Sequence, residues 1–277
     1  MTQLEPRTAQ GRTALQALVR DPGRALVALD FDGTLAPIVS DPAQARAHPA
    51  AVDALSALSR HVGHLAIITG RPAATAVDYA GLRGVPGLQG LVVLGHYGLE
   101  RWDAATDQVT APPPPAGVAE ARRRLPGVLQ ELGAADAYVE DKGASLGVHT
   151  RRLPDPEGTF EQLRRPLQQL AEELGLALEP GRLVLELRPP GMDKGAALRA
   201  LVEELDARTV VFAGDDLGDL AAFDAVDAFR EAGGSGLLVC SGSTEERTLA
   251  QRADLVVDGP DGVVEVLRAL AVLLDRG

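Results

Sequence analysis

The chain of 277 residues is poor in the residue types that many metal and redox sites need. It has one cysteine, Cys240, which cannot form an internal disulfide and fits a small buried hydrophobe in a reducing compartment. With five scattered histidines beside it, this cysteine gives no basis for a Cys/His metal site. Phe, Trp and Tyr make up only 3% of the residues, so we expect a core of Leu, Val and Ala.

The sequence also lacks long apolar runs and an excess of basic residues. No window approaches 18 uncharged apolar residues, and the first residues lack the apolar segment of a signal peptide, so we expect a soluble, cytoplasmic protein. The 39 acidic and 27 basic residues leave a net charge of -12, which repels nucleic acid and anionic lipid. We expect a monomer whose partner is a small molecule. A phosphate-bearing ligand would need a local positive site made by a metal ion, Lys or Arg.

Short aliphatic runs recur along the chain and are separated by segments of helical period. Their nearly continuous apolar character indicates strands that are covered on both faces. Alternation of such strands with helices predicts the α/β class, with a doubly wound, Rossmann-like parallel sheet. The expected strands are 25–30, 64–70, 91–95, 209–215, 236–242 and 254–259.

The middle of the chain has a different pattern, in the order helix, two strands, helix, two strands. This order predicts an antiparallel sheet with helices on one face. We expect a kink at Pro166 and a turn at Pro180-Gly181 between the last two strands.

Proline-rich segments bracket this unit, with Pro112–Pro115 before it and 189–191 after it. We therefore predict a small α+β domain at 108–190. It is inserted into a core domain that 1–107 and 191–277 form together.

The stretch VALDFDGTLAP ends an apolar run with Asp30 and places Asp32 two residues later. Two carboxylates this close are costly unless a cation lies between them. A strand that ends in an ordinary turn would also fit this stretch alone. In an open parallel sheet, however, ligands bind at the carboxyl ends of the strands. Thr69 and Asp215 are also expected at strand ends. Lys194, at the start of a later helix, is a fourth polar residue of this group.

These residue types suit phosphoryl transfer. Asp30 could attack phosphorus and form an aspartyl-phosphate, while Asp32 could protonate the leaving oxygen and then activate water. Thr69 and the Gly70 amide could bind phosphate oxygens at a helix start, and Lys194 would add a point charge.

The same strand ends could hold a cation. Asp215 together with Asp30 could bind Mg²⁺, a hard ion that prefers carboxylate and phosphate oxygens. That ion would remove the repulsion between Asp30 and Asp32.

Four motifs in this order resemble those of the haloacid dehalogenase-like phosphatases. They are DFDGT with Asp30, Asp32 and Thr34, TGR with Thr69, a lone Lys194, and GDD with Asp215 and Asp216. A finer resemblance is to the trehalose-6-phosphate phosphatases. It is carried by GHYGLE (95–100), EDKGASLGVHTR (140–151), LELRPPGMDKGAAL (185–198) and AGDDLGDLAAF (213–223).

This resemblance implies a Mg²⁺-dependent hydrolysis of trehalose 6-phosphate, with the inserted domain as a lid. It implies a metal held by Asp30, the Asp32 carbonyl and Asp215, with Asp216 in support. The residues that it implies for substrate binding are Gly70, Arg71, Arg101, Glu140, Lys142 and Glu186, with His96 as a further candidate. Many family members read GDD-x-TDE, whereas this chain has Gly218 and Leu220 in place of the Thr and the Glu.

Other interpretations stay open at this point. Lys194 could be a solvated helix residue, Asp215-Asp216 a helix cap, and Glu140 to Lys142 a solvated hairpin edge. The substrate could be another sugar phosphate, such as sucrose phosphate or a glucosyl- or mannosyl-phosphoglycerate. The chain could also be a non-catalytic sensor of sugar phosphates, or a phosphotransferase that passes the phosphoryl group to a second sugar.

Overall fold

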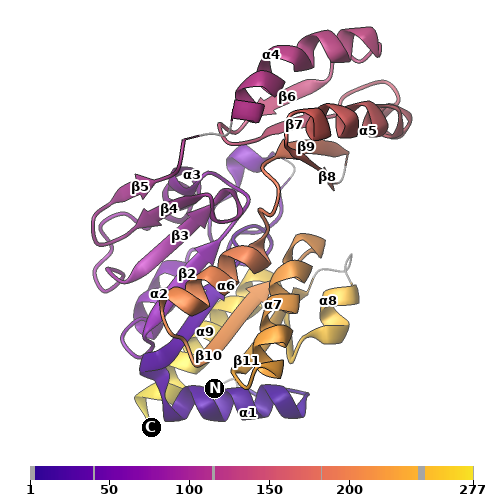
Figure 1. Ribbon diagram of the computed structural model, residues 1–277. Helices are drawn as coiled ribbons and strands as arrows, with labels where there is room; N and C mark the ends of the chain where they lie inside the picture. The colour runs from indigo at the N-terminus through magenta and orange to yellow at the C-terminus, as the bar shows by residue number, and fades with distance from the viewer. Residues whose placement is uncertain (1–3, 40, 114–115, 182, 243–246, 277) are drawn as a thin grey trace. The chain divides into compact units, whose positions relative to one another are not determined.

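The computed structural model describes residues 4–39, 41–113, 116–181, 183–242 and 247–276. The chain forms two compact units, one from Met1–Ala111 with Asp193–Gly277 and the other from Pro112–Met192 (Figure 1). Each unit has a sheet and a hydrophobic core of its own.

The larger unit contains a sheet in the order β12-β11-β10-β1-β2-β3-β4-β5. All pairings from β12 to β3 are parallel, which confirms the predicted doubly wound α/β core. Each predicted core strand is present, as β1 (Ala25–Leu29), β2 (His64–Ile68), β3 (Leu91–Gly95), β10 (Thr209–Gly214), β11 (Ser235–Gly242) and β12 (Leu255–Asp258).

Helices cover this sheet on both faces (Figure 1). Apolar side chains point to both faces of the sheet and require this cover. In β1, Val27 and Leu29 belong to the core on one face, while Leu26 and Ala28 belong to the core on the other. The first core is shared with α1 (Ala9–Arg20), α2 (Ala51–Leu58), α3 (Ala73–Ala80) and α9 (Gly259–Asp275). The second is shared with α6 (Lys194–Glu204), α7 (Leu220–Glu231) and α8 (Arg247–Arg252).

Two short antiparallel strands extend the sheet beyond β3, and the sequence analysis did not predict them. They are β4 (Glu100–Asp103) and β5 (Gln108–Thr110). Since β5 pairs with β4, residues 108–110 lie in the larger unit, and the smaller one begins at Pro112.

The smaller unit is a four-stranded antiparallel sheet in the order β6-β7-β9-β8. Its elements are α4 (Ala116–Glu131), β6 (Tyr138–Asp141), β7 (Leu146–His149), α5 (Pro156–Glu173), β8 (Ala177–Gly181) and β9 (Val184–Arg188). The α+β order matches the predicted one. Leucines and alanines of both helices pack against Leu146, Val148, Leu185 and Leu187 of the sheet.

The turn predicted at Pro180-Gly181 is wrong. Both residues lie within β8 and pair with Leu185 and Val184 of β9, so the chain reverses between Gly181 and Val184. Leu183, at the end of that turn, has a positive φ of 59°. Pro166 lies inside α5, which continues through it. Of the proline run, Pro114 and Pro115 lie outside the described residues.

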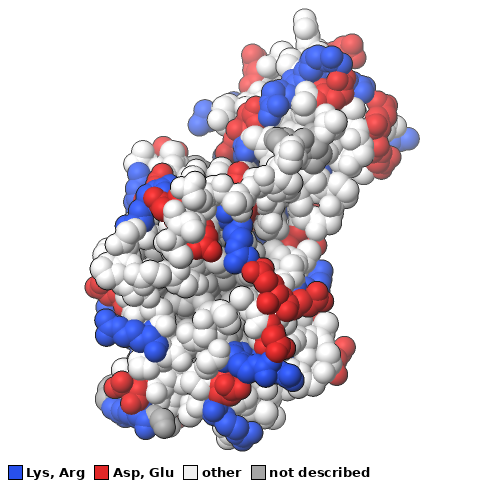
Figure 2. Space-filling model, turned by 60° about the vertical axis from the view of Figure 1, so that its left-hand side comes forward, with Lys and Arg blue, Asp and Glu red and all other residues white. Residues whose placement is uncertain are grey.

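Acidic and basic side chains are interspersed over the face of each unit that Figure 2 shows. This mixture follows from a composition in which 24% of residues are charged, with acidic residues in excess. Within the described ranges, none of the helices combines the length and the apolar character needed to cross a bilayer.

One buried carboxylate ties the start of α1 to the sheet. Asp254 is 1% exposed and accepts hydrogen bonds from the Leu238 amide at 2.7 Å, from the Arg230 guanidinium and from the Thr8 hydroxyl. Thr8 in turn caps α1 by accepting from the Gly11 amide at 2.9 Å. The Asp254 charge is thus compensated by three donors from separate segments.

Replacing Asp254 should therefore destabilise the core unit. We expect Asp254→Ala to lower the free energy of unfolding by about 3–5 kcal/mol, because it leaves the buried Leu238 amide and the Thr8 hydroxyl without their acceptor and removes one of the two carboxylates that pair with Arg230. The exposed Arg24–Asp206 pair is the control. Asp206→Asn removes its charge, suits the positive φ of 46° at this position and should cost less than about 1 kcal/mol. Urea unfolding of both variants measures the difference, and equal losses would contradict this assignment.

Candidate active site

The backbone places Asp30 at the carboxyl end of the central strand. β1 lies between β10 and β2, and the Asp30 amide continues the ladder by donating to the Ala213 carbonyl at 2.9 Å. The residue is 4% exposed. Its carboxylate therefore lies at the edge of the sheet, away from bulk water.

Lys194 bridges two of the carboxylates at this edge. Its Nζ lies 2.7 Å from Oδ1 of Asp30 and 2.7 Å from Oδ1 of Asp219. Lys194 is the first residue of α6, and the Asp193 side chain caps that helix by accepting from the Ala196 amide at 2.7 Å. The lysine is 5% exposed, so it is a buried member of the cluster rather than a solvated helix residue.

Asp219 was not among the predicted site residues, although the structure places it at the centre of the cluster. It is fully buried, and its second oxygen accepts from the amides of Asp215 at 2.9 Å and Asp216 at 3.3 Å. The D-x-x-D spacing of Asp216 and Asp219 is the sequence signal that could have found it, since the two form a capping box around the turn Leu217–Asp219.

Burial and the neighbouring charges perturb the titration of this cluster. Burial raises the pKa of Asp30 well above its ordinary value, although Lys194 opposes the shift. Burial and the Asp219 charge raise the pKa of Asp215 to about 8. Burial acts to lower the pKa of Lys194, but the charges of Asp219 and Asp30 outweigh it and raise the pKa well above the ordinary value.

Asp30, Asp215 and Asp219 each present an oxygen within 4.8 Å of the others, close enough to hold a metal ion. Three carboxylates beside the single ammonium of Lys194 leave a formal excess of two negative charges. Such an excess in a buried place fits a divalent cation, and the carboxylate donors fit a hard one. Both Asp219 oxygens already accept from protein donors, which makes Asp30 and Asp215 the better placed ligands.

Gly33 gives the cluster its space. Its φ of 75° favours glycine, and a Cβ built on it would lie 2.0 Å from Oδ2 of Asp215. The Ser241 hydroxyl, at the end of β11, donates to the Gly33 carbonyl at 2.6 Å and fixes this turn. No sequence motif indicated Ser241.

Asp216 is exposed and precedes the turn Leu217–Asp219. Its carboxylate accepts from the Gly218 amide at 2.9 Å and caps the turn. For Asp216, this agrees with the alternative prediction of a helix cap. Gly218 and Leu220, which replace the usual Thr and Glu, belong to this turn and to the start of α7.

Thr69 and Gly70 follow β2, the strand beside β1. The Thr69 side chain is buried, and its oxygen accepts from the Arg71 amide at 3.1 Å. The Gly70 amide donates to none of the residues that the structure describes. The first amide of α3, that of Ala73, donates instead to Glu100 at 2.7 Å. Any anion at this loop would thus meet Thr69 and Gly70 rather than the helix end.

Arg71 and Asp32 form a bidentate pair. Nε and Nη2 of Arg71 donate to the two Asp32 oxygens at 2.7 and 2.6 Å, and Nη1 donates to the Pro42 carbonyl at 3.0 Å. The guanidinium also lies 5.3 Å from the Tyr79 ring. The Asp32 carboxylate is therefore held by the residue that was predicted to bind substrate.

The smaller unit has a polar face opposite its helices. Glu140, Gly147 and Glu186 are aligned across β6, β7 and β9, so all three lie on the same face. Gly147 has no side chain, and the His149 ring and a Glu140 oxygen lie over it, 3.3 and 3.7 Å from the position of a Cβ. The residues on either side of Gly147 in β7, Leu146 and Val148, point into the core.

Lys142 joins this row. Its Nζ donates to Glu186 at 3.0 Å and lies 4.0 Å from Glu140. Ser145 donates to Glu186 at 2.5 Å, and His149 lies 3.0 Å from Glu140. The structure thus brings together the three predicted sugar-binding residues and adds Ser145 and His149, which the sequence analysis did not select.

Arg101 lies away from the cluster, and His96, although it follows β3 at the same edge of the sheet, is buried beside Glu100. Nη1 of Arg101 donates to both oxygens of Glu204, at 2.9 and 2.8 Å. Glu204 ends the helix that Lys194 begins, about 15 Å further along its axis, so the structure does not bring Arg101 to the cluster. His96 is 1% exposed, and its Nε2 lies 3.6 Å from Glu100.

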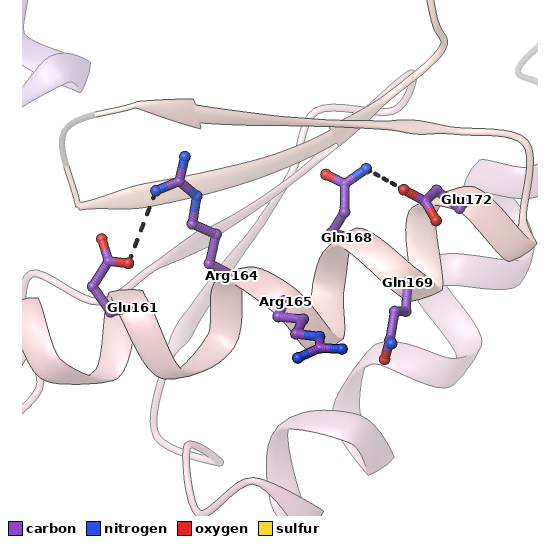
Figure 3. Close-up of a pocket in the computed structure, with 6 residues that line it drawn as sticks. All are labelled: Glu161, Arg164, Arg165, Gln168, Gln169 and Glu172. Atoms are coloured by element: carbon purple, nitrogen blue, oxygen red, sulfur yellow. Dashed lines mark hydrogen bonds and ion pairs between the residues drawn. The ribbon is translucent and has the colours of Figure 1, made fainter.

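A hollow of about 500 Å³ on α5 is not a comparable site. Figure 3 shows that its walls are side chains of this one helix. Glu161 pairs with Arg164, and Gln168 donates to Glu172 at 2.8 Å, as expected along a solvated helix face.

Comparison with known proteins agrees with this geometry. A relative from Mycobacterium tuberculosis H37Rv, named an uncharacterized glycosyl hydrolase, is 37% identical over 214 residues, which are 73% of this chain and 15% of the relative. The trehalose-phosphate phosphatase of Mycobacterium marinum is 32% identical over 273 residues, which are 93% of this chain and 65% of the relative. The chain therefore spans less than two thirds of the length of either protein.

Solved structures share the fold. The C-terminal domain of C. albicans trehalose-6-phosphate phosphatase superposes with a TM-score of 0.75 at 22% identity, over 98% of this chain and 99% of that domain. The sequence model of the trehalose-phosphatase family matches residues 28–258, a range that includes the Asp30 cluster and the polar face of the smaller unit. By this match the chain belongs to the trehalose-phosphatase family.

Proposed function

We propose that this protein is a Mg²⁺-dependent phosphatase that hydrolyses trehalose 6-phosphate to trehalose and phosphate. The observation that carries the proposal is the buried cluster of Asp30, Lys194 and Asp215 at the carboxyl end of the sheet, in a chain of the trehalose-phosphatase family. A monomeric state and a cytoplasmic location stay predictions.

The residues fit a bound Mg²⁺. Asp30, the Asp32 carbonyl and Asp215 would hold it, and Asp216 would support the loop that carries Asp215. When bound, the ion would neutralise the excess charge of the carboxylates and of the phosphate. Asp219 would keep Lys194 in place, because it accepts from the ammonium at 2.7 Å and is anchored by two backbone amides.

Asp30 would act as the nucleophile. Lys194 engages one of its oxygens, which orients the carboxylate and leaves the other oxygen to attack phosphorus. The bond from phosphorus to Asp30 forms as the bond from phosphorus to the sugar oxygen breaks. Water then attacks the aspartyl-phosphate, releasing phosphate and restoring the Asp30 carboxylate. Thr69, the Gly70 amide and Lys194 would bind the phosphoryl oxygens throughout.

Asp32 would move the protons of both steps. It would protonate the departing sugar oxygen and then accept a proton from the attacking water. Both of its oxygens accept from Arg71 in the structure, so a proton can be exchanged only when one of these hydrogen bonds opens. The substrate phosphate would compete for the Arg71 guanidinium, which links substrate binding to the release of Asp32.

The polar face of the smaller unit would bind the sugar part of the substrate. Glu140 and Glu186 offer carboxylate acceptors and Lys142 offers donors, a set suited to several hydroxyls. Because these groups share one face and Lys142 lies beside both glutamates, neighbouring hydroxyls of one sugar could bind to more than one of them.

The first test is phosphate release from a panel of sugar phosphates, with Mg²⁺ and with EDTA. We expect Asp30→Asn to reduce turnover to background, because the amide cannot attack, while circular dichroism shows an intact fold. Turnover of this variant at the wild-type rate would contradict the nucleophile assignment. Release spread evenly over the panel would discard trehalose 6-phosphate as the substrate. Phosphate transferred to a sugar acceptor would indicate a phosphotransferase, and no release from folded wild-type protein would favour a sensor.

Asp215→Asn tests the metal site without turnover. With its pKa raised to about 8, Asp215 weakens the folded state progressively as pH rises from about 4 to about 8, since the unfolded chain releases its proton near the ordinary value of 3.8. In EDTA we expect the variant to match wild type at pH 4 and to be more stable by on the order of 2 kcal/mol at pH 8 to 9.

The Mg²⁺ titration of the same two proteins completes this test. Mg²⁺ should raise the melting temperature of wild type at pH 8 and leave that of Asp215→Asn nearly unchanged, since the variant lacks one ligand. An equal Mg²⁺ response in both proteins would remove Asp215 from the metal site.

Glu140→Ala tests the sugar-reading face. We expect it to lower kcat/KM for trehalose 6-phosphate about 10- to 100-fold, because a buried hydrogen bond to a sugar hydroxyl is lost, and to change hydrolysis of an aryl phosphate less than twofold. Glu173→Ala, which removes an exposed ion pair with Arg124 in the same unit, is the control and should change neither rate. Equal losses on both substrates would mean that Glu140 does not contact the sugar.

A further inference from the structure

The turn after β3 has a backbone that side-chain-bearing residues rarely adopt. His96, Tyr97 and Gly98 have positive φ values of 47°, 57° and 100° in succession. Two consecutive residues other than glycine in this region carry a conformational cost, which persists only where the surroundings impose it. The cause is therefore to be found in what this turn contacts.

The turn is bonded to the loop that follows β2, on both sides of Gly70. The Tyr97 amide donates to the Thr69 carbonyl at 2.9 Å, and the His96 amide donates to the Arg71 carbonyl at 3.0 Å. These two hydrogen bonds hold Tyr97 against the loop. They account for the backbone conformation, because both amides must point back toward β2.

The side chain of Tyr97 lies on Gly70. A Cβ built on Gly70 would come within 2.6 Å of the Tyr97 hydroxyl oxygen and 2.7 Å of Cζ, so no other residue fits at position 70 unless the ring moves. Tyr97 as a whole is half-buried.

Strand order places this hydroxyl on the side of Asp30. β1, β2 and β3 are adjacent and parallel, so Asp30, Gly70 and Tyr97 follow three neighbouring strands at the same edge. The phenol starts from the third strand and lies over Gly70, which follows the second strand, the neighbour of β1.

We propose that the Tyr97 hydroxyl is a substrate-binding group that donates a hydrogen bond to the phosphoryl group held by Thr69 and Gly70. This inference rests on the proposed phosphatase function and adds a residue to its phosphate site. A phenol is a neutral donor that a phosphate oxygen accepts readily. Such a donor suits a net-acidic chain, because it binds an anion without another buried cation.

Tyr97→Phe removes the hydroxyl and keeps the ring on Gly70. Inorganic phosphate is the probe, and its Kd is measured by calorimetry with Mg²⁺ present, beside kcat and KM for trehalose 6-phosphate and for an aryl phosphate. We expect the Kd and both KM values to rise about tenfold, with kcat changed less than threefold. The matched control is Tyr138→Phe, which removes a hydroxyl from an exposed tyrosine of β6 and should leave the Kd for phosphate and the KM for the aryl phosphate unchanged.

A purely structural role would give a different result. Tyr97→Phe would then change the melting temperature while leaving the Kd for phosphate and both KM values at wild-type levels, and this outcome overturns the proposal. A rise in KM for trehalose 6-phosphate alone would also overturn it, because the hydroxyl would then contact the sugar.

Tyr97→Asn keeps the test decisive if the phenylalanine variant folds poorly. Asparagine tolerates the positive φ, so the turn should persist while the hydroxyl over Gly70 is lost. The same tenfold rise in Kd is expected, and an unchanged Kd overturns the proposal. Wild type that binds phosphate but releases none from any substrate would contradict the phosphatase function and leave the comparison of Kd values intact.

Discussion

The ammonium of Lys194, held between Asp30 and Asp219, is the contact on which the arrangement of the site depends. It joins the end of β1, the turn after β10 and the start of α6, three segments that are distant in sequence. The smaller unit ends at Met192, only two residues before this lysine. The chain therefore returns from the inserted unit directly into the cluster, and the helix that follows is anchored by the same two ion pairs.

This arrangement is unfavourable for stability when no cation is bound. Three buried carboxylates share one ammonium, and burial together with the charges of Asp219 and Asp216 raises the pKa of Asp215. The aliphatic packing on both faces of the sheet must offset that cost. A site that is strained without its cation, and relieved when the cation binds, is expected where charge is arranged for reaction rather than for folding.

The parallel sheet and most of the cluster at its edge could be predicted from the sequence. Continuous aliphatic runs identify buried parallel strands, and polar residues at the ends of these strands identify the edge where a ligand binds. The short β4 and β5 escaped prediction because each has few residues and β5 is exposed. Asp219 escaped because its role depends on Lys194, which is 25 positions away in the chain. The pairing of Arg71 with Asp32 likewise depends on the spatial proximity of two strand ends, which local patterns do not encode.

The two units divide the proposed recognition of the substrate. In the proposed function, phosphoryl chemistry would use strand ends of the parallel sheet, whereas the residues proposed to bind the sugar lie on a face of an antiparallel sheet with a separate core. On that face, Glu140 and Glu186 alternate with the core residues Val139 and Leu187 along their strands. The half-exposed Glu140 can thus be exchanged without removing a side chain from the core of the smaller unit. Under the proposed function, sugar preference could change in evolution while the Asp30 cluster stays the same.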